Sequence, residues 1–316
     1  MENLKILNLD IPKNKRIIAI SDIHGEVYLF RALLEKVNFS DDDILILLGD
    51  IYLKGSYPKE TLDFTVDLCK KSNVYALKGN CDFMDETEDS YQEDHKVFLD
   101  SLPHIIETDE ITFVHAGLEQ KHLADQDVLY CLTIRNFLEI AEPFEKWAMV
   151  GHYPVANYCY EMPSYQPIIN DHKKIISIDG GCVIGNDGQL NAFIIENGEF
   201  SYEFVENFQK TIVEQDIEGA KGDLNICFND RFIEILENGE EFSLVRHIKT
   251  GKELCVPTQI IWYYDGKACA TDLATNHFLS LKKGDEVSIV KAFSDRVFAK
   301  SKGIGGWILK NALHER

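Results

Sequence analysis

Long hydrophobic runs and paired cysteines are both missing from this sequence. No apolar run approaches the ~20 residues that a membrane-spanning helix needs, and residues 1–16 lack the apolar core of a secretory signal peptide. The eight cysteines are scattered singly with no CxxC pair, which disfavours a zinc knuckle or a disulfide framework. We therefore expect a cytoplasmic protein with reduced thiols and no membrane partner.

Basic residues are also scarce. The 316 residues include 32 Lys and Arg against 53 Asp and Glu, which gives a formal net charge of -21. Such a surface repels nucleic-acid backbones, although bound divalent cations can reverse the field at one site. Nucleic acid is thus a disfavoured partner, and the 45% hydrophobic content is typical of a globular protein with a sizeable core.

The first part of the chain alternates short apolar runs with amphipathic segments. The runs 16–21, 43–48 and 74–78 predict strands buried on both faces, and the leucine spacing in 26–37 and 61–71 predicts helices. Further strands are expected at 146–150 and 174–178. Hairpins are expected at 105–114, turned at Asp109-Glu110, and at 191–205, turned at Asn197-Gly198. This pattern predicts an α/β fold.

The pattern changes after residue 213. Residues 214–225 are polar, contain two glycines, and predict a linker. Short strand-like runs follow at 231–236, 241–248, 259–264, 286–293 and 307–309, which predicts a small all-β domain. We therefore expect a catalytic domain over 1–213 and an all-β domain over 226–316. The aromatic group Trp262-Tyr263-Tyr264 is expected in the core or interface of the second domain.

Polar side chains that can bind metal ions follow successive predicted strands in the first domain. They are Asp22, His24, Asp50, Asn80, His115 and His152. Because α/β folds place ligand sites at the carboxyl ends of their strands, we expect these side chains to converge. Carboxylate, imidazole and amide ligands suit Mn²⁺ best here, with Fe or Zn²⁺ as alternatives. A carboxylate shared between two such cations is typical of sites that hydrolyse phosphate esters with metal-activated water.

The same motifs resemble those of the calcineurin-like metallophosphoesterases. Asp22-Ile-His24, Gly49-Asp50, Gly79-Asn80, His115 and Gly151-His152 follow the order of the family pattern over about residues 16–200. The resemblance implies a four-layer α+β sandwich in which Asp50 bridges two metal ions. Asp22 and His24 then bind the first ion, and Asn80, His115 and His152 bind the second.

Two further stretches point to one branch of this family. His115-Ala-Gly and Gly151-His-Tyr-Pro-Val resemble the phosphoprotein-phosphatase branch, which includes the diadenosine-tetraphosphate hydrolases. Arg135 lies in a segment similar to the one that carries a phosphate-binding arginine in that branch. A guanidinium fork pairs well with two phosphate oxygens, but a surface arginine is an equally good interpretation. With Asn80 and Lys54, Arg135 completes the expected phosphate-binding set.

The chain departs from the branch at the positions of its leaving-group acid. Leu53 and Lys54 replace the Asp-Arg of the branch pattern, and Cys81 replaces its histidine. Lys54 can contact phosphate only as a point charge. Cys81 is a candidate weak acid, and an inert buried thiol is an equal alternative. We expect poor leaving groups such as serine alkoxide to react slowly, whereas aryl phosphates and phosphoanhydrides need less protonation.

Three functions remain open at this point. The first is a two-metal phosphomonoesterase that acts on a phosphorylated small molecule, a nucleotide or a phosphoprotein. The second is a nucleotide phosphodiesterase or pyrophosphohydrolase on the same scaffold. The third is a metal-binding scaffold with weakened turnover that acts through the all-β domain. Residues 283–287 and 305–309 resemble bacterial SH3-like domains, so this domain is a candidate for binding a protein partner or a second copy of the chain.

Overall fold

A five-stranded sheet lies at the centre of the first part of the computed structural model, which describes residues 3–82 and 93–313. Its strands β2 (Ile17–Ile20), β3 (Ile44–Leu47) and β4 (Val74–Ala76) run parallel. The hairpin β10 (Leu190–Glu196) and β11 (Glu199–Val205) adds to the edge beside β2, in the order β11-β10-β2-β3-β4. The strands predicted from the apolar runs and the hairpin turned at Asn197-Gly198 are all confirmed.

A six-stranded sheet follows the order β1-β5-β6-β7-β9-β8. Its strands are β1 (Ile6–Asn8), β5 (Ile105–Glu107), β6 (Ile111–Val114), β7 (Trp147–Val150), β8 (Ile168–Asn170) and β9 (Ile175–Ser177). The β5–β6 hairpin is antiparallel as predicted, while β6, β7 and β9 run parallel. The carboxyl ends of β6 and β7 therefore lie at one edge of this sheet.

Alternate side chains along the five-stranded sheet pack into two different hydrophobic cores. Ile18 and Ile20 pack into a cluster with helical side chains such as Phe30, whereas Ala19 packs with Phe113 of the six-stranded sheet. This alternation follows from the two-residue period of a strand. Each such buried side chain stabilises the fold by about 1.5–3 kcal/mol. The mixed α/β class predicted from the sequence is confirmed.

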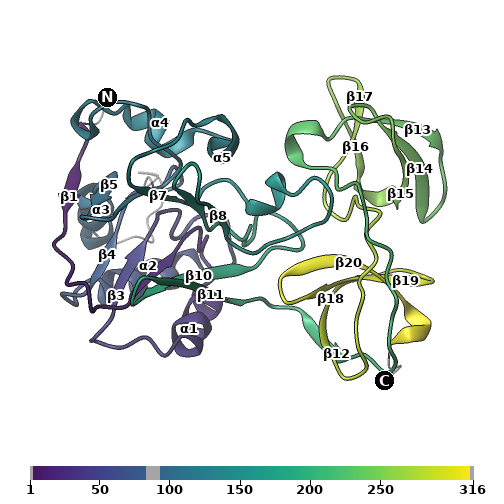
Figure 1. Ribbon diagram of the computed structural model, residues 1–316, viewed down its shortest axis with the longest axis horizontal. Helices are drawn as coiled ribbons and strands as arrows, with labels where there is room; N and C mark the ends of the chain where they lie inside the picture. Colours follow the sequence, from purple (N-terminus) through teal and green to yellow (C-terminus); the bar gives the residue numbers. More distant parts are fainter. Residues whose placement is uncertain (1–2, 83–92, 314–316) are drawn as a thin grey trace. The chain divides into compact units, whose positions relative to one another are not determined.

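Helices cover one face of the five-stranded sheet (Figure 1). They are α1 (Val27–Lys36), α2 (Pro58–Leu68) and α3 (Glu93–Ser101), and their apolar side chains belong to the first of the two cores. Two shorter helices, α4 (Val128–Thr133) and α5 (Phe137–Ile140), follow β6. The Asp127 side chain caps α4 by accepting a hydrogen bond from the Tyr130 N–H at 2.9 Å. None of the helices described for this chain has the length and apolar content that crossing a membrane requires.

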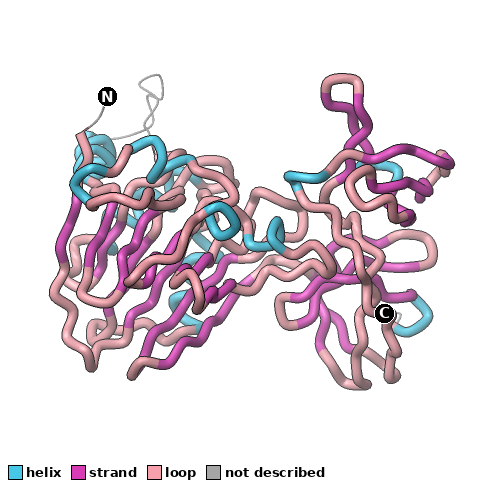
Figure 2. The backbone as a smooth tube through the Cα atoms, turned by 45° about the horizontal axis from the view of Figure 1, so that its top comes forward, coloured by secondary structure: helices cyan, strands magenta, loops and turns pink. Residues whose placement is uncertain are grey.

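A second compact unit consists of residues Asn207–Arg316 with the segments Ala156–Gln166 and Gly185–Asp187. Figure 2 shows strands and loops with only short helical turns in this part of the chain. One four-stranded sheet has the order β12-β18-β19-β20, formed by β12 (Gln209–Ile212), β18 (Glu286–Ala292), β19 (Arg296–Ser301) and β20 (Ile304–Leu309). The all-β region expected here is confirmed.

Two smaller sheets complete this unit. Three strands form an antiparallel sheet, namely β13 (Ile233–Glu237), β14 (Phe242–His247) and β15 (Glu253–Pro257). A hairpin joins β16 (Ile261–Tyr264) to β17 (Lys267–Ala270). The eight cysteines, all within the described residues, form no disulfide.

The structure differs from two expectations in this unit. Residues 214–225 are not a free linker, because Ile217 pairs with Leu281 and Leu224 is buried in a core. The aromatic side chains on β16 do not fill a core, since Tyr263 and Tyr264 are 66% and 55% exposed. The Arg231 guanidinium instead stacks on Trp262 and Tyr264, at 4.7 and 5.1 Å from the ring centroids.

Candidate metal centre

The six candidate metal ligands lie at the ends of five strands that run toward one edge of the two sheets. Asp22 and His24 follow β2, and Asp50 follows β3. The Nε2 atom of His24 lies 3.7 Å from Asp22 Oδ1 and 3.7 Å from Asp50 Oδ2. The structure thus brings the donors of two neighbouring parallel strands into one cluster.

The remaining three ligands complete the other side of Asp50. His115 Nε2 lies 3.4 Å from Asp50 Oδ1 and 3.0 Å from Asn80 Oδ1. The rings of His115 and His152 meet with centroids 5.0 Å apart. Asp50 therefore directs one carboxylate oxygen toward each half of the cluster.

Two groups of donors are close enough to hold a cation. His24, Asp50 and Cys81 form one group, and Asp50, His115 and His152 form the other, with the donor atoms of each group within 4.8 Å of one another. Asp50 belongs to both groups. This is the arrangement that two cations sharing one carboxylate require.

Several ligands adopt a backbone conformation that is uncommon for residues other than glycine. The φ angles of Asp22, His24, Asp50 and His152 are 55°, 50°, 51° and 65°. Aspartate and histidine are among the residues that tolerate this left-handed region, and such strain often accompanies functional sites. The sharp reversal that it produces turns each side chain back across the end of its strand.

Glycines permit the close approach of the loops that carry the ligands. A Cβ atom on Gly79 would lie 2.2 Å from the Asp50 nitrogen. One on Gly151 would lie 1.7 Å from Ser21 Oγ and 2.4 Å from Asp22 Oδ2. Because real Cβ contacts are never that short, any larger residue would push the ligand strands apart.

Main-chain carbonyls fix the orientation of two imidazole rings. His24 Nδ1 lies 3.1 Å from the Leu53 carbonyl oxygen, and His115 Nδ1 lies 2.7 Å from that of Leu48. A carbonyl only accepts hydrogen bonds, so Nδ1 carries a proton in both rings, and the neutral ring of His24 presents the lone pair of its Nε2 atom to the centre. This is the tautomer that binds a metal ion through Nε2.

One ring nitrogen of His152 lacks a hydrogen-bond partner in the described structure. The main chain of Thr133 hydrogen-bonds to its ring, but its Nε2 atom is buried without a hydrogen-bond partner in the described structure. A buried polar atom without a partner costs about 1–3 kcal/mol. A cation at this position would satisfy it, so the donor set fits a metal ion.

Burial and neighbouring charges shift the pKa values of histidines and aspartates in the cluster. Burial lowers the pKa of His24 to about 4 and that of His152 to about 3, so both rings are neutral at pH 7. Burial and the Asp50 charge raise the pKa of Asp22, and burial and the Asp22 charge raise that of Asp179. Gathering several buried carboxylates is unfavourable without cations.

Two aspartates that sequence reasoning did not select support the centre. The buried Asp82 carboxylate accepts hydrogen bonds from the main-chain N–H groups of Asp50 at 2.7 Å, Gly79 at 2.8 Å and Ile51 at 2.8 Å. Asp179 follows β9 and lies beside Asp22, with Oδ2 buried and without a partner among the residues described. The rule that selected the other ligands, a polar residue just past a buried strand, would also have found Asp179.

Lys54 and Arg135 occupy different positions around the centre. Lys54 is part-exposed, with Nζ 3.9 Å from Asp50 Oδ2. Arg135 lies exposed in the short link between α4 and α5, and its charge contributes to the lowered pKa of His152. Lys54 therefore lies in ion-pair range of Asp50, a candidate metal-ligand carboxylate.

Cys81 lies inside the cluster. Its N–H donates to Asp50 Oδ1 at 2.7 Å, and its Sγ accepts from Asn80 Nδ2 at 3.1 Å. Burial, followed by the Asp50 charge, raises the pKa of the thiol to about 12. A thiol this weakly acidic is a poor proton donor to a leaving group at neutral pH.

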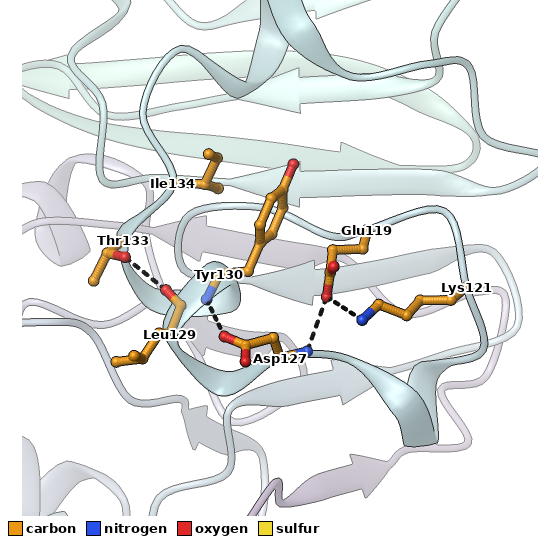
Figure 3. A pocket seen from close by; sticks show the side chains of 7 residues that line it. All are labelled: Glu119, Lys121, Asp127, Leu129, Tyr130, Thr133 and Ile134. Atoms are coloured by element: carbon orange, nitrogen blue, oxygen red, sulfur yellow. Dashed lines mark hydrogen bonds and ion pairs between the residues drawn. The ribbon is translucent and has the colours of Figure 1, made fainter. Parts of the chain in front are cut away.

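A surface pocket of about 450 Å³ lies along α4, in the same segment whose Thr133 main chain holds His152. Figure 3 shows its walls, where the Tyr130 ring and Ile134 lie to one side of Glu119 and Lys121. The Glu119 carboxylate pairs with Lys121 at 2.7 Å and accepts from the Asp127 N–H at 3.0 Å. The polar groups of this pocket are therefore largely paired with one another.

The family model of calcineurin-like phosphoesterases matches residues 15–178. This chain belongs to the calcineurin-like phosphoesterase family. The matched range contains all six candidate ligands of the metallophosphoesterase. No curated protein matches the chain.

One solved structure shares the fold of this metallophosphoesterase, and a second shows a weaker likeness. A protein assigned as a diadenosine tetraphosphatase is 23% identical, with a TM-score of 0.51 over 65% of this chain and 99% of its own. A protein serine/threonine phosphatase from Saccharomyces cerevisiae, similar to human phosphatase PP5, is 14% identical, with a TM-score of 0.48 over 66% of this chain and 85% of its own. The family and the donor groups together identify a metal-dependent hydrolase of phosphoester bonds.

Proposed function

We propose that this metallophosphoesterase hydrolyses phosphomonoesters whose leaving groups need little protonation, such as aryl phosphates and phosphotyrosine. The observation that carries the proposal is the position of Asp50, which contributes to both donor groups and contacts both His24 and His115. When bound, the metal pair supplies polarisation of the phosphate and activation of water. Mn²⁺ is the first candidate metal, with Fe and Zn²⁺ as alternatives.

The ligands divide between two metal positions in this proposal. Asp22, His24 and Asp50 hold the first cation, and Asp50, Asn80, His115 and His152 hold the second. The imidazoles of His24 and His152 are neutral at pH 7, so they suit this role without a preceding loss of protons. Asp82 acts as a positioning residue, because its three hydrogen bonds hold the Asp50 and Gly79 loops together.

Phosphate binding is assigned to Lys54, Arg135 and the Asn80 amide. Lys54 adds a positive charge next to Asp50. This charge partly offsets the repulsion between the buried carboxylates and an anionic substrate. Arg135 can form two parallel hydrogen bonds to phosphate oxygens. Its exposed position allows this fork to contact a substrate that enters beside His152.

The leaving-group preference follows from the residues at the acid position. The Leu53 side chain packs against the core, and its main-chain carbonyl contacts His24 Nδ1. An apolar side chain cannot hydrogen-bond to a proton donor for the leaving group. Cys81 is too weakly acidic to protonate an alkoxide efficiently. Phosphoanhydrides also leave readily, which keeps nucleotide pyrophosphohydrolysis as a second candidate of the same chemical class.

A leaving-group series with Mn²⁺ tests the proposal. We expect kcat/KM to fall by at least about 100-fold from aryl phosphate to phosphoserine peptide, because one lost proton donor costs about 10²–10⁴-fold. Dinucleoside polyphosphates in the same series distinguish anhydride from monoester cleavage. A phosphoserine peptide that reacts faster than the aryl ester would contradict the proposal.

The second unit is proposed to mediate contacts, while the first unit carries the chemistry. The support is the exposed aromatic hairpin on β16, where Tyr263 is the most exposed side chain. Exposed aromatic side chains gathered on one hairpin are typical of binding surfaces. The protein partner or second copy of the chain that this surface fits is to be sought by cross-linking the full-length protein.

A further inference from the structure

We propose that the Cys81 thiolate is itself a ligand of the first cation, alongside Asp22, His24 and Asp50. The inference rests on the proposed function and deepens its metal centre. Its basis is distance: Cys81 Sγ lies within 4.8 Å of the donor atoms of both His24 and Asp50. A cation between those two side chains would therefore have the sulfur as a neighbour.

The main chain holds the sulfur in this place. The Cys81 N–H donates to Asp50 Oδ1, and Asp82, the next residue, accepts three main-chain hydrogen bonds from Asp50, Ile51 and Gly79. The position of Cys81 is thus fixed against the same carboxylate that both donor groups share.

The Asn80 side chain makes a hydrogen bond to the Cys81 sulfur. Its Nδ2 donates to Cys81 Sγ at 3.1 Å, while its Oδ1 lies 3.0 Å from His115 Nε2. In this orientation the oxygen faces the second donor group and the N–H faces the sulfur. The Asn80 amide therefore contacts the sulfur on one side and the second donor group on the other.

Cys69 shows what a thiol in apolar surroundings looks like in this protein. It is part-buried and packs against the apolar cluster under the five-stranded sheet. Cys81 is part-buried to a similar degree, but its neighbours are polar donors. Apolar packing therefore accounts for Cys69 but gives no reason for the place of Cys81.

A sulfur ligand would make the two metal positions chemically different. The first would combine two carboxylates, one imidazole and one thiolate, whereas the second would have only nitrogen and oxygen donors. Thiolate favours Zn²⁺ and Fe over Mn²⁺. On binding, the S–H proton passes to solvent and the sulfur lone pair forms the bond to the cation, with no change in oxidation state.

Cobalt spectroscopy of the full-length protein tests the inference without using turnover. Sulfur bound to Co²⁺ gives an intense near-ultraviolet charge-transfer absorption that oxygen and nitrogen ligands lack. We expect this band in the wild type and in Cys69→Ser, the matched control, and its loss in Cys81→Ser. We also expect Cys81→Ser to weaken Cd²⁺ binding at the first position by at least about tenfold.

A second measurement on the wild type covers the case in which Cys81→Ser does not fold. Alkylation with iodoacetamide, followed by peptide mass spectrometry, should label Cys81 in the metal-free protein and not in the Zn²⁺-loaded protein. Equal labelling of Cys81 with and without Zn²⁺ would overturn the inference.

The outcomes separate this inference from the proposed function. Two bound Co²⁺ ions with hydrolysis but no charge-transfer band would overturn the sulfur ligand and leave the function standing. A band that persists in Cys81→Ser would also overturn it. A band without any phosphoester hydrolysis would support the ligand and contradict the function, and a protein that binds no Co²⁺ would contradict both.

Discussion

Two histidines whose Nε2 atoms are enclosed, the buried His247 of the second unit and the part-buried His152 of the first, have very different environments. In the second unit His247 contacts Thr250 Oγ1 through Nδ1 at 3.0 Å and the Asp230 carbonyl through Nε2 at 2.6 Å. In the first unit His152 has a buried Nε2 with no partner among the described residues. A histidine with both nitrogens paired is explained by the fold, whereas one with an unpaired nitrogen indicates a missing ligand.

Buried carboxylates show the same difference. Asp230 in the second unit accepts from the Cys227 N–H at 3.0 Å and pairs with Lys249 at 3.3 Å. In the first unit Asp22, Asp50 and Asp179 are each at most 2% exposed. Besides burial, the Asp50 charge raises the pKa of Asp22, and the Asp22 charge raises that of Asp179. The comparison teaches that a site can be recognised by the interactions that the protein alone leaves unmet.

The substitution Asp50→Asn should have the largest effect on activity. Removing the charge of the carboxylate shared by both donor groups should lower kcat/KM for an aryl phosphate by at least about 10³-fold. The asparagine oxygen can still accept from the Cys81 N–H, so the fold should persist. The kinetic assay is paired with metal analysis, and Asp230→Asn is the matched control, expected to stay within about twofold of wild-type activity. Full turnover by Asp50→Asn would contradict the role of the shared carboxylate.

Replacing His247 or His152 by alanine should affect different properties of the protein, stability in the first case and metal affinity in the second. His247→Ala leaves the Asp230 carbonyl without its donor and should lower the unfolding free energy by about 2–4 kcal/mol, with no change in metal affinity. His152→Ala should lower metal affinity by at least about tenfold and change the metal-free stability by less than about 1 kcal/mol. Urea unfolding and metal titration measure the two effects. If both variants lost stability equally and neither lost metal, the comparison would be wrong.

Asp82→Asn should have an intermediate effect on the metal centre. An asparagine side chain can accept at its oxygen, but its NH₂ group faces a main-chain N–H that needs an acceptor. We expect kcat to fall about 10–100-fold, as is typical when a group that orients a metal ligand is changed. The assay measures kcat together with metal content. A fall in KM alone, with kcat and metal content unchanged, would argue against positioning.

The smallest effect is expected on stability, from replacing Asp43, a carboxylate of the first unit whose two oxygens both accept hydrogen bonds. Asp43 accepts from Arg16 Nε and Nη2, both at 2.9 Å, and from the Ser40 N–H at 2.8 Å. Although burial opposes its ionisation, these partners lower the pKa of Asp43. The folded protein therefore binds the proton more weakly than the unfolded chain, so the contribution of Asp43 is present above about pH 4.

Urea unfolding of the wild type and Asp43→Asn as a function of pH checks this. The difference in unfolding free energy should be about 1–3 kcal/mol at pH 7, constant above about pH 4, and should shrink as pH falls through the folded-state pKa. Activity per bound metal should stay unchanged. A difference that grows on acidification would contradict the assigned direction.

The candidate ligands could be selected from the sequence because each follows a recognisable buried strand. The runs before Asp22, Asp50 and His152 are short and apolar, and their two-sided burial is visible in composition alone. The role of Asp82 was not predictable in this way, because its partners are the main-chain groups of Asp50, Ile51 and Gly79. No residue pattern records a hydrogen bond to a distant backbone.

The all-β unit was harder to predict for a related reason. Its strands were recognised in part, but residues 214–225 resemble a linker in composition and are held only by partners such as Leu281 that lie far along the chain. Polar side chains on an edge segment give no sign of its pairing. The exposure of Tyr263 was likewise invisible, since an aromatic strand residue is usually half-buried.

The pairing of β10 with β2 has a consequence for synthesis of the protein. Residues 190–196 supply the neighbour of the strand that carries Asp22 and His24, with Ala192 opposite Ile20. A ribosome making the chain must therefore release about two hundred residues before the central sheet can close. Until then the nascent polypeptide lacks the strand that borders the segment carrying Asp22 and His24, so the complete metal centre can form only in the later part of synthesis.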